Sequence, residues 1–133
     1  MRVAELATRA GVARHVVRYY VRVGLLRPGR APNGYADFGE VHLTRLMFIR
    51  KAQRLGFTLD EIGGLLVRHD AGDDVSRQVR RIGEQRRIET AVELRELRAL
   101  HGRLCEAVRV WRRMPAASSK DSGICPLITG LPP

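Results

Sequence analysis

The residues from Ser76 to Met114 most constrain what this chain can fold into. The stretch contains no proline, and its charged residues alternate in sign, which is typical of a long, largely solvated helix. At about 1.5 Å per residue, a helix of this length would extend roughly 58 Å. Such a helix cannot fold back on one small domain along its whole length, so its apolar positions need a partner. Those positions are Val75, Val79 and Ile82 in the first half and Leu94, Leu97, Leu104, Val108 and Trp111 in the second.

The apolar pattern of this stretch is interrupted between Gly83 and Arg87. We therefore predict antiparallel pairing with a second copy of the chain, strong in places, rather than a continuous heptad zipper. A chain of 133 residues supports one small domain plus an extension. The expected organisation is a folded domain over residues 1–70, a dimerisation helix over 75–114, and a loop with a short apolar tail over 115–133.

A basic helix is predicted near the start of the chain. Arg14, Arg18 and Arg22 follow one another at every fourth position, and like charges at that spacing destabilise an isolated helix. The row is therefore most easily explained by a polyanion lying against it, and Tyr19 can add a ring and a hydroxyl to that face. The alternative is an ordinary solvated face. On the other side of the helix Val16, Val17 and Tyr20 recur at helical spacing.

Turn and capping signals place this helix in a helix-turn-helix followed by a hairpin. A first helix over residues 3–9 ends at Gly11, and Asn33-Gly34 is a strong hairpin signal. A third helix is expected from about Gly39 to Leu55, largely buried, with Asp37 and Glu40 as a possible capping box. A clearer capping box, Thr58-Leu59-Asp60-Glu61, opens a fourth helix.

The positive charge is concentrated at the start of the chain. The formal net charge is +10, and residues 1–37 carry seven arginines against two acids, a net +5. This concentration favours a local anionic partner over a generally basic protein. The sequence shows no nucleophile–base pair and no phosphate-cradling glycine loop, so we do not expect an enzyme. We also expect no signal peptide and no membrane span, and two cysteines are too few for a disulfide framework, so a cytoplasmic location is expected.

Several motifs together resemble the MerR family of bacterial transcription regulators. They are Val17-Arg18-Tyr19-Tyr20 followed by Gly24-Leu25-Leu26, Asn33-Gly34-Tyr35, the run Leu55-Gly56-Phe57-Thr58-Leu59-Asp60-Glu61-Ile62, and the terminal Cys125-Pro126-Leu127-Ile128. The resemblance implies an all-α fold with a small β-hairpin wing: a winged helix-turn-helix DNA-binding domain followed by a long antiparallel coiled-coil dimerisation helix. It also implies a homodimer on double-stranded promoter DNA, with one recognition helix of each copy in the major groove. Effector binding would then distort the promoter and align its elements for RNA polymerase.

The resemblance and the basic face together predict the DNA-binding residues. By matching positions, Arg18, Tyr19 and Tyr35 would contact DNA, and the basic face adds further candidates. The predicted set is Arg14, His15, Arg18, Tyr19, Tyr20, Arg30 and Tyr35. Two positions depart from the family pattern, since Ala36 stands where an arginine is common and Val21 where a glutamate is common.

The effector is predicted less directly, because the cysteine pattern of the family's metal sensors is incomplete here. His101 and Cys105 lie at i and i+4, a spacing at which two side chains can share an ion, and Cys125 could supply a third ligand. The expected ion belongs to the Zn, Hg, Cd, Pb or Cu class. Alternatively, Cys105 is a buried small apolar residue beside a satisfied histidine, or Cys125 is a reactive thiol near Lys120. Two further functional alternatives are an effector-independent DNA-bending regulator of the same fold and a coiled-coil adaptor with a solvated basic head.

Overall fold

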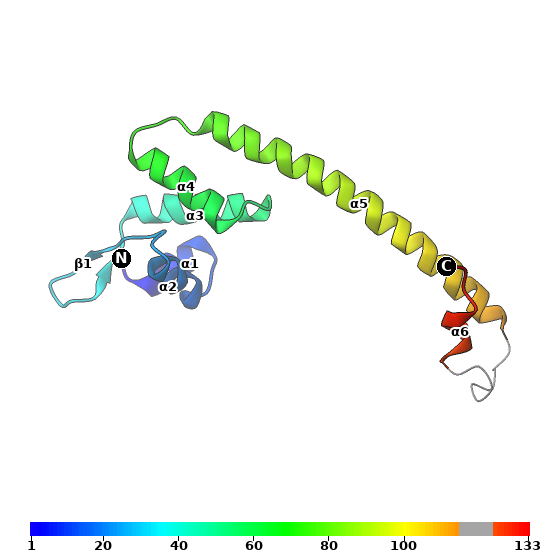
Figure 1. Cartoon of the computed structure of the whole chain (residues 1–133). Helices are drawn as coiled ribbons and strands as arrows, with labels where there is room; N and C mark the ends of the chain where they lie inside the picture. Colours follow the sequence, from blue (N-terminus) through cyan, green and yellow to red (C-terminus); the bar gives the residue numbers. More distant parts are fainter. Residues whose placement is uncertain (115–123) are drawn as a thin grey trace. The chain divides into compact units, whose positions relative to one another are not determined.

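The computed structural model describes residues 1–114 and 124–133, whose regular elements are helices apart from one short hairpin (Figure 1). They form two compact units, Met1–Arg86 and Arg87–Pro133. The elements are α1 (Val3–Ala10), α2 (Arg14–Arg22), β1 (Gly29–Arg30), β2 (Ala36–Asp37), α3 (Glu40–Arg54), α4 (Leu59–Asp70), α5 (Ser76–Arg113) and α6 (Pro126–Thr129). The predicted fold class, all-α with a small hairpin, is confirmed.

The helix-turn-helix of the first unit is formed by α1 and α2, which pack against each other. The turn between them contains Gly11 at φ +69°, a left-handed conformation that glycine adopts without steric cost. The amide of Val12 donates to the carbonyl of Ala7 (3.0 Å) and so continues the turn. On α2, Val17 and Tyr20 are buried, which leaves the arginine-bearing side exposed.

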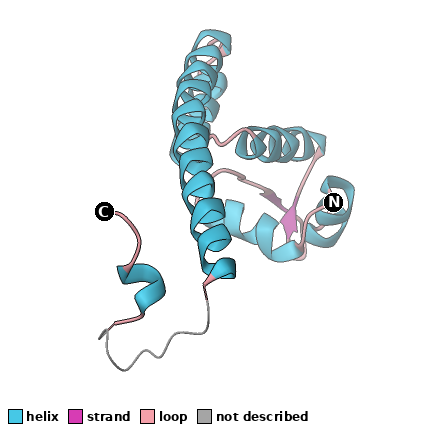
Figure 2. Ribbon diagram, turned by 90° about the vertical axis from the view of Figure 1, so that its right-hand side faces the viewer, coloured by secondary structure: helices cyan, strands magenta, loops and turns pink. Residues whose placement is uncertain are grey.

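The wing, residues Gly29–Asp37, is an antiparallel hairpin in which Gly29 lies opposite Asp37 and Arg30 opposite Ala36. Its tip contains Gly34 at φ +84°, as the Asn33-Gly34 signal predicts. The start of the chain lies beside the base of the wing in both views (Figures 1 and 2). There the amino group of Met1 donates to Asp37 Oδ1 (2.9 Å) and to the carbonyl of Phe38 (2.5 Å).

The capping box predicted at Asp37 and Glu40 is wrong. Asp37 binds the amino group of Met1, and Glu40 forms a two-pronged ion pair with Arg9 of α1. At the start of α3 the amide of Gly39 donates instead to His42 Nδ1 (2.8 Å). Both carboxylates that the sequence predicted to cap α3 are therefore bound by groups distant along the chain.

Helices α3 and α4 follow in the first unit. Only one face of α3 is fully buried, so it is less enclosed than its sequence predicts: Leu46, Ile49 and Ala52 are buried, while other apolar side chains are partly exposed. The capping box at the start of α4 is confirmed, because Thr58 Oγ1 accepts from the Glu61 amide (3.1 Å) and Glu61 Oε1 accepts from the Thr58 amide (2.9 Å).

Every helix of the first unit contributes to one apolar core. Its fully enclosed large side chains are Leu6, Val17, Leu26, Phe38, Leu46, Ile49 and Ile62. Val75, Val79 and Ile82 from the beginning of the long helix pack against this core, and Arg86 donates to Glu61. The first turns of α5 therefore pack with the first unit, and the division expected between residues 70 and 75 stays a prediction.

The second unit consists of the remainder of α5 and the four-residue helix α6. Trp111 Nε1 donates to the carbonyl of Leu127 (2.8 Å), which holds α6 beside the end of α5. Sequence analysis predicts a short apolar tail here and does not predict its helical turn. Across residues 1–114 and 124–133, no helix has the combination of length and apolar character that crossing a membrane requires.

Candidate nucleic-acid interface and effector region

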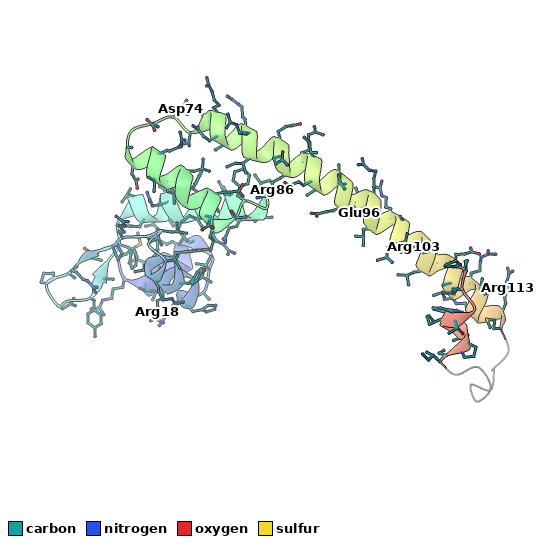
Figure 3. The ribbon with its side chains drawn as sticks, in the orientation of Figure 1. Arg18, Asp74, Arg86, Glu96, Arg103 and Arg113 are labelled. Atoms are coloured by element: carbon teal, nitrogen blue, oxygen red, sulfur yellow. The ribbon has the colours of Figure 1, made fainter. Side chains whose placement is uncertain are left out.

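The outer side of α2 presents its basic and aromatic side chains to solvent. Arg14, His15 and Arg18 are exposed, and Tyr19 is 38% exposed. Figure 3 labels Arg18, which lies on the helix-turn-helix in the first unit. The guanidinium carbon of Arg22 lies 5.5 Å from the centre of the Tyr19 ring, so this ring is held by a cation–π contact. The predicted α2 candidates are therefore accessible to a ligand, with one exception described below.

The wing adds a tyrosine and an arginine, but their roles differ. Tyr35 is 60% exposed, and its ring lies beneath the guanidinium of Arg2, 4.4 Å from ring centre to the guanidinium carbon. Arg30 Nη1 donates to the carbonyl of Gly34 (3.2 Å), which closes the tip of the wing. Arg30 therefore stabilises the hairpin internally while its exposed guanidinium keeps further donors for a ligand.

A pocket of about 260 Å³ lies where α1, α2 and the wing meet. We call it the arginine pocket, and its lining residues are Arg2, Val3, Ala4, Arg14, Arg18, Tyr35 and Ala36. Three predicted residues, Arg14, Arg18 and Tyr35, are brought together here, while His15, Tyr19 and Arg30 lie outside the lining. Sequence analysis missed Arg2, because its neighbours in the pocket are distant along the chain. The concentration of arginines in residues 1–37 was the only signal that included it.

Tyr20 is the candidate that the structure removes from the interface. It is 2% exposed, and its hydroxyl donates to Gln53 Oε1 on α3 (2.5 Å). Because both its ring and its hydroxyl are engaged inside the first unit, Tyr20 packs the helix-turn-helix against α3. The expectation that it contacts DNA is therefore wrong.

The three guanidinium groups of the arginine pocket have no acidic partner among the described residues. Within that part of the chain, none of Arg2, Arg14 and Arg18 forms an ion pair, in contrast to Arg9, Arg45, Arg86 and Arg109. The nearby carboxylate of Asp37 is bound by the amino group of Met1. Guanidinium groups without a carboxylate partner, together with a tyrosine hydroxyl, bind phosphate oxygens well.

The candidate effector residues lie in the second unit. Cys105 Sγ is 3.6 Å from His101 Nε2 and 3.8 Å from Nδ1, and both Cys105 and Cys125 are exposed. Cys105 is exposed in the single chain but adjoins Leu104 and Val108, so the alternative of a buried apolar cysteine stays a prediction. Nowhere among the described residues do three His, Cys, Asp or Glu side chains gather as a metal site would require. The structure thus joins His101 to Cys105 but not to Cys125, and Lys120 lies outside the described residues.

Comparison with known proteins identifies the chain. The family described as "MerR HTH family regulatory protein" matches residues 1–68, and "MerR, DNA binding" matches residues 43–107. The chain belongs to the MerR family. It is a DNA-binding transcription regulator and not an enzyme.

Individual relatives of this MerR-family chain cover almost its whole length. The HTH-type transcriptional regulator HmrR of Rhizobium leguminosarum bv. viciae is 31% identical over 131 residues, 98% of this chain and 97% of the relative. The crystal structure of PbrR691 from Ralstonia metallidurans CH34 in complex with lead(II) is similar at 31% identity and a TM-score of 0.78, covering 98% of each chain. That of the dual-function regulator MerR from Bacillus megaterium MB1 in complex with mercury(II) is similar at 30% identity and a TM-score of 0.63, again over 98% of each.

Proposed function

We propose that this MerR-family protein acts as a homodimer that binds promoter DNA with two helix-turn-helix units and distorts it in response to an effector. The observation that carries the proposal is an uncovered apolar stripe on the second half of α5. Leu94, Leu97 and Leu104 of this stripe are 47%, 62% and 49% exposed. Side chains of this size at spacings of three and seven residues define one side of a helix, the pattern used in helix pairing.

The stripe supports a second copy of the chain as the partner. Leu94, Leu97 and Leu104 are continued by Val108 and Trp111, so alternating steps of three and four residues extend beyond Leu104. An antiparallel pair would bury these positions and bring two basic surfaces into one assembly. Two such surfaces on one face of a duplex are the arrangement that dimeric helix-turn-helix proteins use to bind half-sites.

Replacing Leu97 with glutamate tests the homodimer. A charge at the most exposed leucine of the stripe would have to be buried on pairing, so the variant should be monomeric at micromolar concentration where the parent is dimeric. Light scattering after gel filtration measures the mass of each. The matched control is Arg103→Glu, an exposed position outside the stripe. A parent that is itself monomeric, or a Leu97→Glu variant as dimeric as the control, would contradict the proposal.

Binding of the homodimer to duplex DNA should depend steeply on salt. Each phosphate neutralised by an arginine contributes a slope of about −0.9 to the logarithm of affinity against the logarithm of salt concentration. The test titrates the DNA upstream of the gene at several salt concentrations and measures bending by circular permutation of the binding site. A flat salt response would favour the coiled-coil adaptor. Transcription by RNA polymerase from the same DNA then reports whether distortion activates the promoter.

A metal ion of the soft class is the effector that we propose, because similar structures hold lead(II) and mercury(II). The fit of this chain to such an ion is partial. Ligand distances of about 2.3 Å to sulfur and 2.0 Å to nitrogen at a tetrahedral angle put the two atoms roughly 3.5 Å apart, and Cys105 Sγ lies 3.6 Å from His101 Nε2. The pair therefore suits two positions of a tetrahedral site. No group of three ligands forms within the described part of one chain, so we derive no gating step through a metal.

The incomplete ligand set favours a second candidate, a regulator of the same fold that bends DNA without an effector. Transcription from the upstream promoter against zinc, mercury, cadmium, lead, copper and a thiol oxidant distinguishes the two. A response lost in Cys125→Ser and in Cys105→Ser supports a metal effector, and a response to the oxidant alone that needs only Cys125 supports a reactive thiol. Equal transcription under every condition supports the effector-independent regulator.

A further inference from the structure

We propose that Arg2 is a DNA-contacting residue that binds one backbone phosphate in the arginine pocket together with Arg14 and Arg18, and that the ring of Tyr35 positions it. The inference rests on the duplex binding described under Proposed function. It adds a phosphate-binding group from the start of α1 to those expected from α2 and the wing. The ligand is a phosphodiester of duplex DNA, and free phosphate is the other source of the same chemistry.

The position of Arg2 is fixed by its neighbours on both sides. It is the N-cap residue of α1, with extended backbone angles of φ −84° and ψ 168°. Directly before it, Met1 is tied to the base of the wing, since its carbonyl accepts from the Phe38 amide (2.8 Å) and its amino group binds Asp37 (2.9 Å). Although Arg2 is exposed, the backbone that carries it is therefore held against the wing.

The Tyr35 ring also orients the side chain of Arg2. Its guanidinium carbon lies 4.4 Å from the centre of the Tyr35 ring, within the range of a cation–π contact. Stacking uses the flat face of the guanidinium and leaves its edge N–H groups free to donate. A guanidinium oriented before binding loses less conformational entropy when a phosphate arrives. Ala36 contributes only a methyl group to the lining, so the pocket stays open beside the stacked pair.

The charge of the pocket favours an anion over solvent alone. Arg2, Arg14 and Arg18 line one pocket of about 260 Å³, and among the described residues no carboxylate forms an ion pair with any of them. Three like charges in one pocket repel one another, and an anion bound among them removes that repulsion. Val3 and Ala4 from the first turn of α1 complete the lining, and the Arg2 side chain makes no capping hydrogen bond to this helix start.

A phosphate of a DNA duplex fits this pocket because the neighbouring surfaces of α2 and the wing are also exposed to the duplex. Arg14 and Arg18 belong to the exposed face of α2 that also carries Tyr19, and Tyr35 belongs to the wing. A phosphate held in the pocket would thus touch α1, α2 and the wing at once. Contacts of this kind fix the register of a protein on DNA without reading its sequence.

The experiment compares Arg2→Gln with Arg103→Gln in the full chain. Arg103 is an exposed arginine of α5 outside the pocket, so both variants lose one positive charge. Fluorescence anisotropy measures the affinity for a labelled duplex of the upstream DNA over a series of salt concentrations. Loss of the Arg2 charge should lower the salt slope by up to about 0.9 for the pocket phosphate, equivalent to at most a roughly eightfold weaker affinity at 0.1 M salt. In a homodimer the change in salt slope and the change in the logarithm of the affinity are both doubled. Arg103→Gln should change neither the slope nor the affinity.

The role of Tyr35 is tested by two further variants. Tyr35→Phe keeps the ring under Arg2, whereas Tyr35→Leu removes it. If the ring positions Arg2, the losses of binding free energy from Arg2→Gln and Tyr35→Leu should be less than additive in the double variant. In the Tyr35→Phe background, which keeps the ring, Arg2→Gln should still weaken duplex binding. Strict additivity with Tyr35→Leu would overturn the positioning role.

A scan with neutral methylphosphonate linkages identifies the phosphate itself. The parent should lose more affinity than Arg2→Gln at one linkage per half-site, because Arg14 and Arg18 still contact that phosphate in the variant. Equal sensitivity of both proteins at every linkage, or equal salt slopes for Arg2→Gln and Arg103→Gln, would overturn the inference while leaving salt-dependent binding by the parent intact. Absence of salt-dependent binding by the parent would instead refute the proposed function. Inorganic phosphate at constant ionic strength should not displace the duplex, and displacement that requires Arg2 would make the pocket a free-phosphate site.

Discussion

Replacing Tyr20 with phenylalanine separates a packing role from a DNA-binding role for this residue of α2. Tyr20 is 2% exposed and donates to Gln53 Oε1 at 2.5 Å. Phenylalanine keeps the ring and removes only the hydroxyl, so no large cavity forms. We expect the variant to lose stability and to keep the salt dependence of duplex binding.

The size of the effect follows from the hydrogen bond. An intramolecular hydrogen bond contributes about 0.5–1.5 kcal/mol net, and leaving a buried acceptor unsatisfied costs about 1–3 kcal/mol. Since Gln53 is only partly buried, a loss of about 1.5 kcal/mol is the working value. For a chain of this size that corresponds to a fall of about 5–8 °C in Tm. Thermal unfolding followed by circular dichroism, at one protein concentration and without DNA, measures it.

Tyr19→Phe is the matched control on the same helix. Tyr19 is 38% exposed, and its ring contacts Arg22. Removal of its hydroxyl should leave Tm nearly unchanged and weaken duplex binding. If Tyr20→Phe instead kept the parental Tm and bound the duplex less tightly, the assignment of Tyr20 to the core would be refuted.

Two further predictions concern the stability of the first unit. Thr58→Ala removes the side chain that accepts from the Glu61 amide and should lower the free energy of unfolding by about 1 kcal/mol in urea denaturation; an unchanged midpoint would show that the cap contributes nothing. Hydrogen bonds from Arg45 hold the pKa of the Asp70 carboxyl below its ordinary value, so the unfolded chain takes up this proton first. The stabilisation is complete above the unfolded pKa of about 3.9 and is lost as pH falls through the lower pKa of the folded state. Asp70→Asn should therefore be less stable at neutral pH and lose less on acidification, and a urea midpoint with the parental pH dependence would contradict the assignment.

The parts of the fold that sequence predicted correctly depend on local chemistry. A left-handed glycine, Gly34, marks the tip of the hairpin, and Thr58 with Glu61 caps α4. Each of these motifs spans no more than four residues, so its local structure depends little on the rest of the folded protein. The absence of proline and the alternating sign of the charges likewise predicted the long helix to within about one residue of its observed end, the usual uncertainty of a helix terminus.

The parts that sequence missed depend on contacts between distant residues. Asp37 binds an amino group 36 positions away rather than capping α3. Arg2 stacks on Tyr35, which is likewise distant from it along the chain. Tyr20 is a different case, because its spacing from Val17 already placed it on the apolar side of α2. The predicted DNA-binding set nevertheless included Tyr20, and the three-residue spacing was the better guide.

The carboxylate of Glu61 accepts two hydrogen bonds, one from the Thr58 amide at the start of α4 and one from the Arg86 guanidinium of α5. Its pKa is held below the ordinary value by the first of these bonds and then by the second. Protecting one of these segments from opening therefore protects the other. In native-state hydrogen exchange, the amides of both segments should open together as a single cooperative group.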